Sequence, residues 1–145
     1  MKATLDGEPW YGRSMYSILN EIHPAVVFKR LNEEGHSMID LLYHMITWTQ
    51  FTLQRIRHEP KAPEGEDEET LDWRLIDPLE HTWVKGLEQL RDLHDQIIME
   101  LESRDDSFLN EMVEFRGYSF RFLLNGLIQH DIYHLGQIAM LKKSI

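Results

Sequence analysis

The sequence predicts an all-α protein, a four-helix bundle with long connections between its helices. Four segments place apolar residues at the three- and four-residue spacing of an amphipathic helix, and strand-like alternation is weak throughout. The chain has 145 residues, enough to bury a core without disulfides, so we expect one domain over residues 1–145. Four helices of similar length bury their apolar faces most simply against one another, and the long connections allow a departure from simple up-down-up-down topology.

The first helix is expected over residues 7–22. Asp6 is its candidate N-cap, and Pro24 marks its end. Its apolar face would consist of Tyr11, Met15, Ile18, Leu19 and Ile22.

The second helix is expected over residues 36–57. Its wide apolar face predicts deep burial. The next segment, residues 58–70, combines two prolines, a glycine and a dense run of acidic residues, which predicts a solvated loop.

The third helix is expected to begin at Asp77 and to end near residue 103. Asp77 is a candidate N-cap, Pro78 suits the first helical position, and Glu80 has the spacing of a capping box. Its inner face would comprise Leu79, Trp83, Leu87, Leu90, Ile97 and Leu101.

The fourth helix is expected over residues 118–143, and two histidines interrupt its apolar face. The predicted seam alternates spacings of three and four residues, with Asp131 expected outside it, exposed or capping a neighbour. A buried polar group without a partner costs about 1–3 kcal/mol, so histidines in such a seam need an explanation. The members of this seam are Phe120, Leu123, Leu127, His130, His134, Gln137 and Leu141.

Histidines four residues apart project from one face of a helix, as in many helical metal sites. A catalytic zinc ion usually takes three protein ligands, so a third ligand should come from a facing helix. His44 is the best candidate, because it lies midway along the second helix, and His94 on the third helix is the runner-up.

Composition excludes several other functions. The chain has no cysteine, which rules out disulfides, zinc–thiolate sites and a thiol nucleophile of its own. A formal net charge of −10 argues against nucleic acid as a partner. The sequence shows neither a signal peptide nor an apolar run of about 18 residues, so we expect no membrane association and a cytoplasmic location.

Three blocks of the sequence resemble the DinB-like (YfiT-like) family of four-helix-bundle proteins. The block GLIQHDIYHLGQIAMLKK resembles the family's C-terminal motif, H-x-x-x-H-x-G-Q. The block HSMIDLLYHMITW resembles a second motif, in which a histidine precedes a tryptophan by four residues. The block GEPWYGRSMYSILNEI resembles the N-terminal motif that opens with G-x-x-W-x-G. The blocks follow the family's order and together span nearly the whole chain.

The resemblance implies a divalent metal ion, most often zinc or nickel, held by three histidines. These map to His44, His130 and His134, so the resemblance favours His44 over His94. It also implies a homodimer. Family members with known activity include metal-dependent S-transferases that use low-molecular-weight thiols such as bacillithiol or mycothiol, and many others have no known substrate.

The sequence therefore predicts a metal-dependent enzyme acting on a small molecule, either thiol S-transferase-like or hydrolase-like, because a metal ion eases deprotonation of a bound thiol or water. The alternative is a non-catalytic bundle, with a structural metal or none, acting as a dimeric binding or stress protein. Three further residues are candidates for the surroundings of the site: Trp48 as a pocket wall, Gln137 as a hydrogen-bond partner, and Asp40 as a group that orients His44.

Overall fold

The structure, a computed structural model, describes residues 1–63 and 65–145. Within these residues the secondary structure is helical, with one isolated β-bridge between Met112 and Ser119 and no strand, so the predicted all-α class is confirmed. Each described helix is too short or too polar to cross a membrane. The α-helices are Lys2–Leu5 (α1), Met15–Leu19 (α2), Met38–Ile56 (α3), Glu68–Leu71 (α4), Trp83–Glu102 (α5) and Phe120–Ser144 (α6), and Pro24–Val26 and Asp106–Asn110 form 3₁₀ turns.

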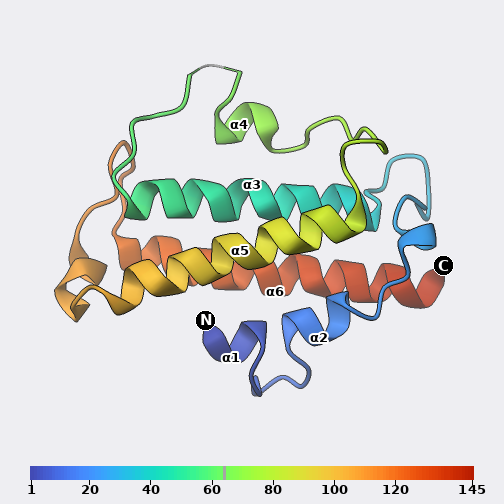
Figure 1. The fold of residues 1–145 in the computed structure, drawn as a ribbon, viewed down its shortest axis with the longest axis horizontal. Coiled ribbons are helices and arrows are strands. Elements are labelled where there is room, and N and C mark those ends of the chain that lie inside the picture. Colours follow the sequence, from blue (N-terminus) through green and yellow to red (C-terminus); the bar gives the residue numbers. More distant parts are fainter. Residues whose placement is uncertain (64) are drawn as a thin grey trace.

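Three long helices, α3, α5 and α6, form the body of the bundle (Figure 1). Helix α5 runs in the same direction as α3, and α6 runs antiparallel to both. The connection from α3 to α5 must therefore return along the whole length of α3, and it carries α4 over the outer side of that helix. The short helix α2 packs against α6 and occupies the fourth position of the bundle.

The first predicted helix, residues 7–22, is wrong in extent. Asp6 follows α1 instead of capping a helix, and Ser14 is the N-cap residue of α2. Between the two short helices the amide of Gly12 donates to the carbonyl of Pro9, closing a turn, and Gly12 has a positive φ of 127°. Such a φ suits glycine and cannot continue a right-handed helix. Met15 and Leu19 are nevertheless fully buried, so the prediction that these two residues face the core is confirmed.

The third helix begins later than predicted. Helix α5 starts at Trp83, with the hydroxyl of Thr82 accepting the amide of Lys85 as the N-cap. Asp77 caps a separate turn, in which its carboxylate accepts the amide of Leu79. Because that turn does not continue into the helix, Leu79 is exposed rather than part of the inner face. The C-terminal end of the helix agrees with the prediction.

Helices α3 and α6 begin and end within two residues of their predicted positions. Both have clear N-caps. In α3, Ser37 and Asp40 form a reciprocal capping box, and in α6 the hydroxyl of Ser119 accepts the amide of Phe122. These caps satisfy amide groups that have no partner inside the helix, which fixes where each helix starts.

The buried face of α6 coincides only in part with the predicted seam. Four members of the seam are buried as predicted, but the buried face extends to one side of it. The predicted members that are buried are Phe120, Leu127, His134 and Leu141, and the additional buried residues are Leu124, Asp131, Leu135 and Ile138. His134 is also buried, but His130 is only half-buried. The histidine pair thus lies at the edge of the core and not in its centre, which leaves room for contact with a ligand.

Asp131 is a correction to the sequence analysis, because it is 1% exposed rather than on the surface. Its Oδ2 lies 3.1 Å from Nε2 of the fully buried His94, and Nδ1 of that ring lies 2.8 Å from the hydroxyl of Tyr16. A carboxylate only accepts, so His94 donates from Nε2 and its Nδ1 accepts the Tyr16 proton. Burial raises the pKa of Tyr16, which keeps that proton on the hydroxyl. The network joins α2, α5 and α6.

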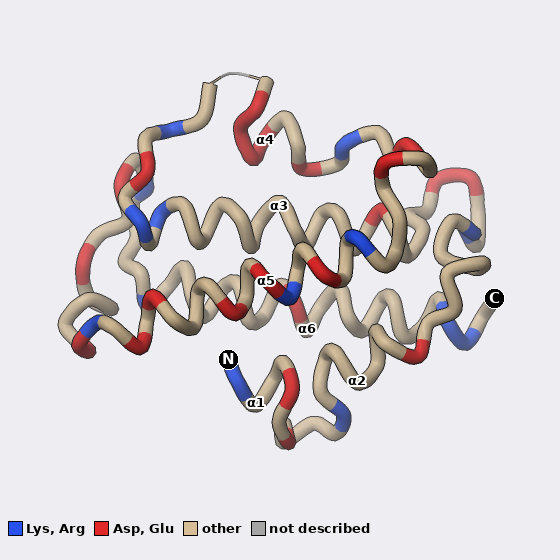
Figure 2. The backbone as a smooth tube through the Cα atoms, in the orientation of Figure 1, with Lys and Arg blue, Asp and Glu red and all other residues tan. Residues whose placement is uncertain are grey.

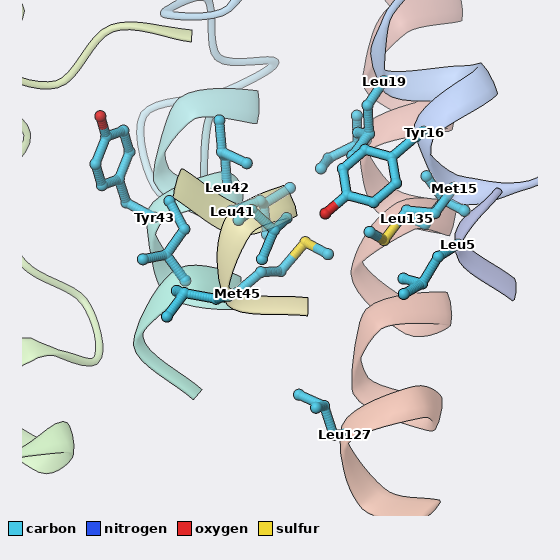
Figure 3. Close-up of a cluster of buried hydrophobic side chains, with 14 of the residues drawn as sticks. Leu5, Met15, Tyr16, Leu19, Leu41, Leu42, Tyr43, Met45, Leu127 and Leu135 are labelled. Carbon is cyan, nitrogen blue, oxygen red and sulfur yellow. The ribbon is translucent and has the colours of Figure 1, made fainter. Parts of the chain in front are cut away.

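Figure 3 shows the Tyr16 side chain reaching from α2 into the interior, among buried residues of the core such as Met15, Leu19 and Leu135. The hydroxyl is therefore the polar end of a side chain that otherwise packs as an apolar core residue.

Replacing Tyr16 by phenylalanine is expected to lower the free energy of unfolding by about 1–3 kcal/mol, because the shape is kept but His94 loses the donor to its Nδ1. Denaturant-induced unfolding measures the change. The control is Tyr133→Phe on α6, which removes an exposed hydroxyl and should change stability little. Equal stability of the two variants would contradict the assigned role of the network.

Candidate metal centre

Three imidazoles meet between α3 and α6. His44 comes from the middle of α3, and His130 and His134 occupy successive turns of α6. One ring nitrogen from each residue lies within 4.8 Å of the other two, and the Nε2 atoms of His44 and His130 are 2.9 Å apart. The structure thus brings together the three histidines predicted from the sequence. His94, the runner-up, is engaged in the network with Tyr16 and Asp131 instead.

Asp72 orients the ring of His44. Its Oδ1 lies 2.9 Å from Nδ1 of His44 and also accepts the indole N–H of Trp48 at 2.6 Å. The hydrogen bond of Nδ1 goes to the backbone carbonyl of Asp72 at 3.3 Å, and a carbonyl only accepts, so the proton of His44 is on Nδ1 and its lone pair resides on Nε2, the atom that faces His130. Asp72 therefore fixes the tautomer of a histidine through its carbonyl and the position of a neighbouring tryptophan through its carboxylate.

Gln137 has the corresponding relation to His134. Its Oε1 lies 2.6 Å from Nδ1 of His134, so the side chain predicted as a hydrogen-bond partner occupies that position. The acceptor holds the proton of His134 on Nδ1 and leaves Nε2 free. Nδ1 of His130 is buried and has no hydrogen-bond partner among the described residues.

Asp40 does not orient His44, contrary to the sequence-based expectation. Its carboxylate accepts the amide and hydroxyl of Ser37 and forms an ion pair with Arg30 at 2.8 Å. All three contacts are made by Oδ2 of Asp40, and they stabilise the start of α3. Asp40 still lines the recess next to His44, but Asp72 performs the role that was expected of it.

Trp73 covers the site from outside. Its ring stacks on His44 at 3.9 Å between centroids with an interplanar angle of 9°, and on His36 at 3.7 Å and 12°. The indole thus lies between two imidazoles and shields one face of His44 from solvent. His36 is exposed and completes this stack on the other face of the indole.

The sequence analysis missed both Asp72 and Trp73. They follow α4 in the connection that returns along α3, and only that return path places them over the middle of α3 (Figure 1). Residues 58–70 of this connection were predicted as a solvated loop, yet α4 begins within them, with Asp67 as its N-cap. The one available signal was an aspartate–tryptophan pair directly after an acidic run, which periodicity does not identify as functional.

All three imidazoles have pKa values below the ordinary value. Burial is the main cause, and it lowers the pKa of His130 to about 3, with further contributions from His134 and His44. Burial also lowers the pKa of His44 and of His134, partly opposed by Asp72 and Gln137 respectively. Figure 2 shows no charged residue along the middle of α3, which agrees with this poorly solvated setting. The group is therefore uncharged at neutral pH, the state in which imidazole binds metal ions.

Two hollows flank the histidines. A polar recess of about 320 Å³ opens beside His44 and is lined by Arg30, His36, Asp40, Asp72 and Arg74 together with apolar residues of the same connection. An apolar cavity of about 200 Å³ lies beside His130, and Trp48 forms part of its wall, as expected from the sequence. A small molecule can thus approach the site from two sides of different character.

Comparison with protein families decides the assignment. A family model described as the DinB superfamily matches residues 12–138. This chain belongs to the DinB superfamily. The match contains all three clustered histidines together with Asp72 and Gln137, so the whole candidate site lies inside the DinB region of the chain. A search of curated proteins found no significant match.

In the metal-free DinB protein, we expect the free energy of unfolding to fall as the pH drops below about 6.5, the ordinary pKa of histidine. Because His44, His130 and His134 have lowered pKa values when folded, the unfolded chain takes up protons below this pH that the folded chain does not. For His130 the loss continues until the pH approaches about 3.

Denaturant unfolding between about pH 7.5 and 5, where most carboxylates stay ionised, measures this slope. A His130→Gln variant, which has one such imidazole fewer, should show a shallower dependence. A parent protein with equal stability across the range would contradict the lowered pKa values.

Proposed function

We propose that this DinB superfamily protein is a metal-dependent enzyme that transfers a low-molecular-weight thiol to a small electrophile. The observation that carries the proposal is the convergence of three uncharged imidazoles, two of which have Nδ1 bound to an acceptor and Nε2 directed inward. Such an arrangement is costly for a core unless the nitrogens bind something.

The donor set fits a divalent transition metal. Imidazole nitrogens suit zinc and nickel, and three protein ligands leave a position open for a further group. Asp72 and Gln137 supply the acceptors that histidine ligands generally need at their other nitrogen. A divalent ion bound there would supply the positive charge that lowers the pKa of a thiol or water reaching it.

A thiol suits the surroundings better than water does. A free thiol has a pKa of about 8.5, against about 15.7 for water, so it needs far less assistance from a base. The two carboxylates that line the recess beside His44 are already engaged, Asp72 by His44 and Trp48, and Asp40 by Ser37 and Arg30. The chain has no cysteine, so the thiol would come from a second small molecule.

The reaction would form one bond from sulfur to carbon. The thiol gives up its proton to solvent, the sulfur lone pair attacks the electrophilic carbon, and the bond from that carbon to the leaving group breaks as the leaving group departs with its bonding electrons. The chain's own residues would hold the reaction centre, orient the imidazoles through Asp72 and Gln137, and limit access of water through Trp73.

The purified protein, prepared without a histidine tag or chelator, is expected to contain about one equivalent of zinc or nickel. His130→Ala and His134→Ala should each lose most of it, whereas His23→Ala, which removes an exposed histidine far along the chain from the group, should retain it. Elemental analysis measures the stoichiometry. A parent that stays metal-free after zinc and nickel have been supplied would sink the proposal.

Metal-loaded protein should then join a low-molecular-weight thiol to a haloalkyl electrophile, with mass spectrometry detecting the conjugate. A metal ion with no open coordination position would instead favour a structural metal. Reaction of the electrophile with water rather than with the thiol would favour a hydrolase. The His130→Ala variant serves as the inactive control in the same assay.

Asp72→Asn is expected to weaken metal affinity by about 10- to 100-fold, since the variant loses the negative charge that lies 2.9 Å from Nδ1 of His44. Competition with a chelator of known affinity measures the change. Asp95→Asn, which alters an exposed aspartate on α5, is the matched control and should leave affinity unchanged. Equal affinities for the two variants would show that Asp72 does not support the site.

A further inference from the structure

We propose that the apolar cavity beside His130 binds an aromatic, or similarly flat and apolar, group of the small-molecule substrate. Gly126 keeps this cavity open. That the bound molecule is a substrate rests on the proposed function, but the cavity's preference for such a group can be tested without any reaction.

The cavity lies between the two helices that supply the histidines. Helix α6 lines it with Phe122, Gly126 and His130, which follow one another at four-residue intervals and so share one side of the helix. The remaining lining residues are Trp48, Phe51 and Thr52 of α3, Leu123 and Leu127 of α6, and Tyr118 just before α6.

The lining contains no lysine, arginine, aspartate or glutamate and is dominated by aromatic rings. This composition is typical of sites that select apolar and aromatic groups rather than charged ones. The volume of about 200 Å³ exceeds the roughly 150 Å³ of an engineered apolar cavity that binds benzene. An aromatic ring with a short substituent therefore fits.

One histidine of the candidate metal centre lines the cavity. His130 lines the cavity while its Nε2 lies 2.9 Å from Nε2 of His44. The wall opposite α6 is held in place as well, because the indole of Trp48 donates to the same oxygen of Asp72 that contacts His44. A ring bound in the cavity would thus place its substituent next to His130, one of the three clustered imidazoles.

Gly126 explains why the space exists. It lies inside a long helix, where glycine is less favourable than any residue except proline. Close packing does not demand it, since a Cβ built at this position meets no atom within 4 Å. By contrast, a Cβ at Gly86 of α5 would lie 2.6 Å from Leu42. A larger side chain at position 126 would occupy the cavity that the glycine lines.

The test uses benzyl alcohol as the probe and the indole N–H resonance of Trp48, assigned by Trp48→Phe, as the readout. Full-length protein is titrated as purified and again after metal removal. We expect a saturable shift of the Trp48 resonance in both forms. Gly126→Leu should weaken probe binding at least tenfold, and Gly126→Ala should weaken it less.

Gly136→Leu is the matched control, because it makes the same change in the same helix. A Cβ built at Gly136 also meets no atom within 4 Å, and this glycine does not line the cavity. It should bind the probe like the parent. Metal content is measured for each variant, so a chain that lacks metal but binds the probe refutes the proposed function and leaves the cavity's preference standing.

Three results would overturn the inference. The first is a Trp48 resonance that does not respond to the probe, and the second is a Gly126→Leu variant that binds the probe as tightly as Gly136→Leu does. The third is a change of oligomeric state, by sedimentation, in Gly126→Leu alone, which would mean that a second copy covers the cavity around the exposed Phe122.

Discussion

The rotation of α6 about its own axis is the constraint on which the rest of the structure depends. The pair between Asp131 and His94 fixes that rotation, because both partners are buried and each would lose its hydrogen bond if the helix turned. With Asp131 directed at α5, the neighbouring His130 falls at the boundary of the core and faces α3. A polar contact outside the site thus determines where the site lies.

Sequence patterns identified α3 and α6 well because a long periodic apolar face is a local signal. They failed at residues 7–22, where a turn through Pro9 and Gly12 divides an apolar pattern that looks continuous. They also identified only part of the buried face of α6. When a helix is apolar over a wide arc, two adjacent lines of residues both show spacings of three and four, and only the tertiary partner His94 selects the line that contains Asp131.

The residues of the candidate site also fall into those that the sequence could predict and those that it could not. Spacing identified the histidine pair on α6, and the family resemblance selected His44 over His94. The sequence could not reveal Asp72 or Trp73, because their position over α3 depends on the path of a connection without periodicity. The role of Gln137 could be predicted because it lies one turn beyond His134 on the same helix. Asp40 lies one turn before His44, but its contacts with Arg30 and Ser37 hold it elsewhere.

The return of the connection between α3 and α5 has an evolutionary consequence. Helices α3 and α6 supply the three imidazoles, and the connection supplies Asp72 and Trp73, which orient and cover His44. The candidate metal ligands and the residues that cover them therefore lie in separate stretches of sequence. Changes in the connection can alter exposure of the site and its preference among ligands while the helical interfaces stay as they are. One bundle of this kind can therefore diversify its chemistry by exchanging a surface segment rather than by rebuilding its core.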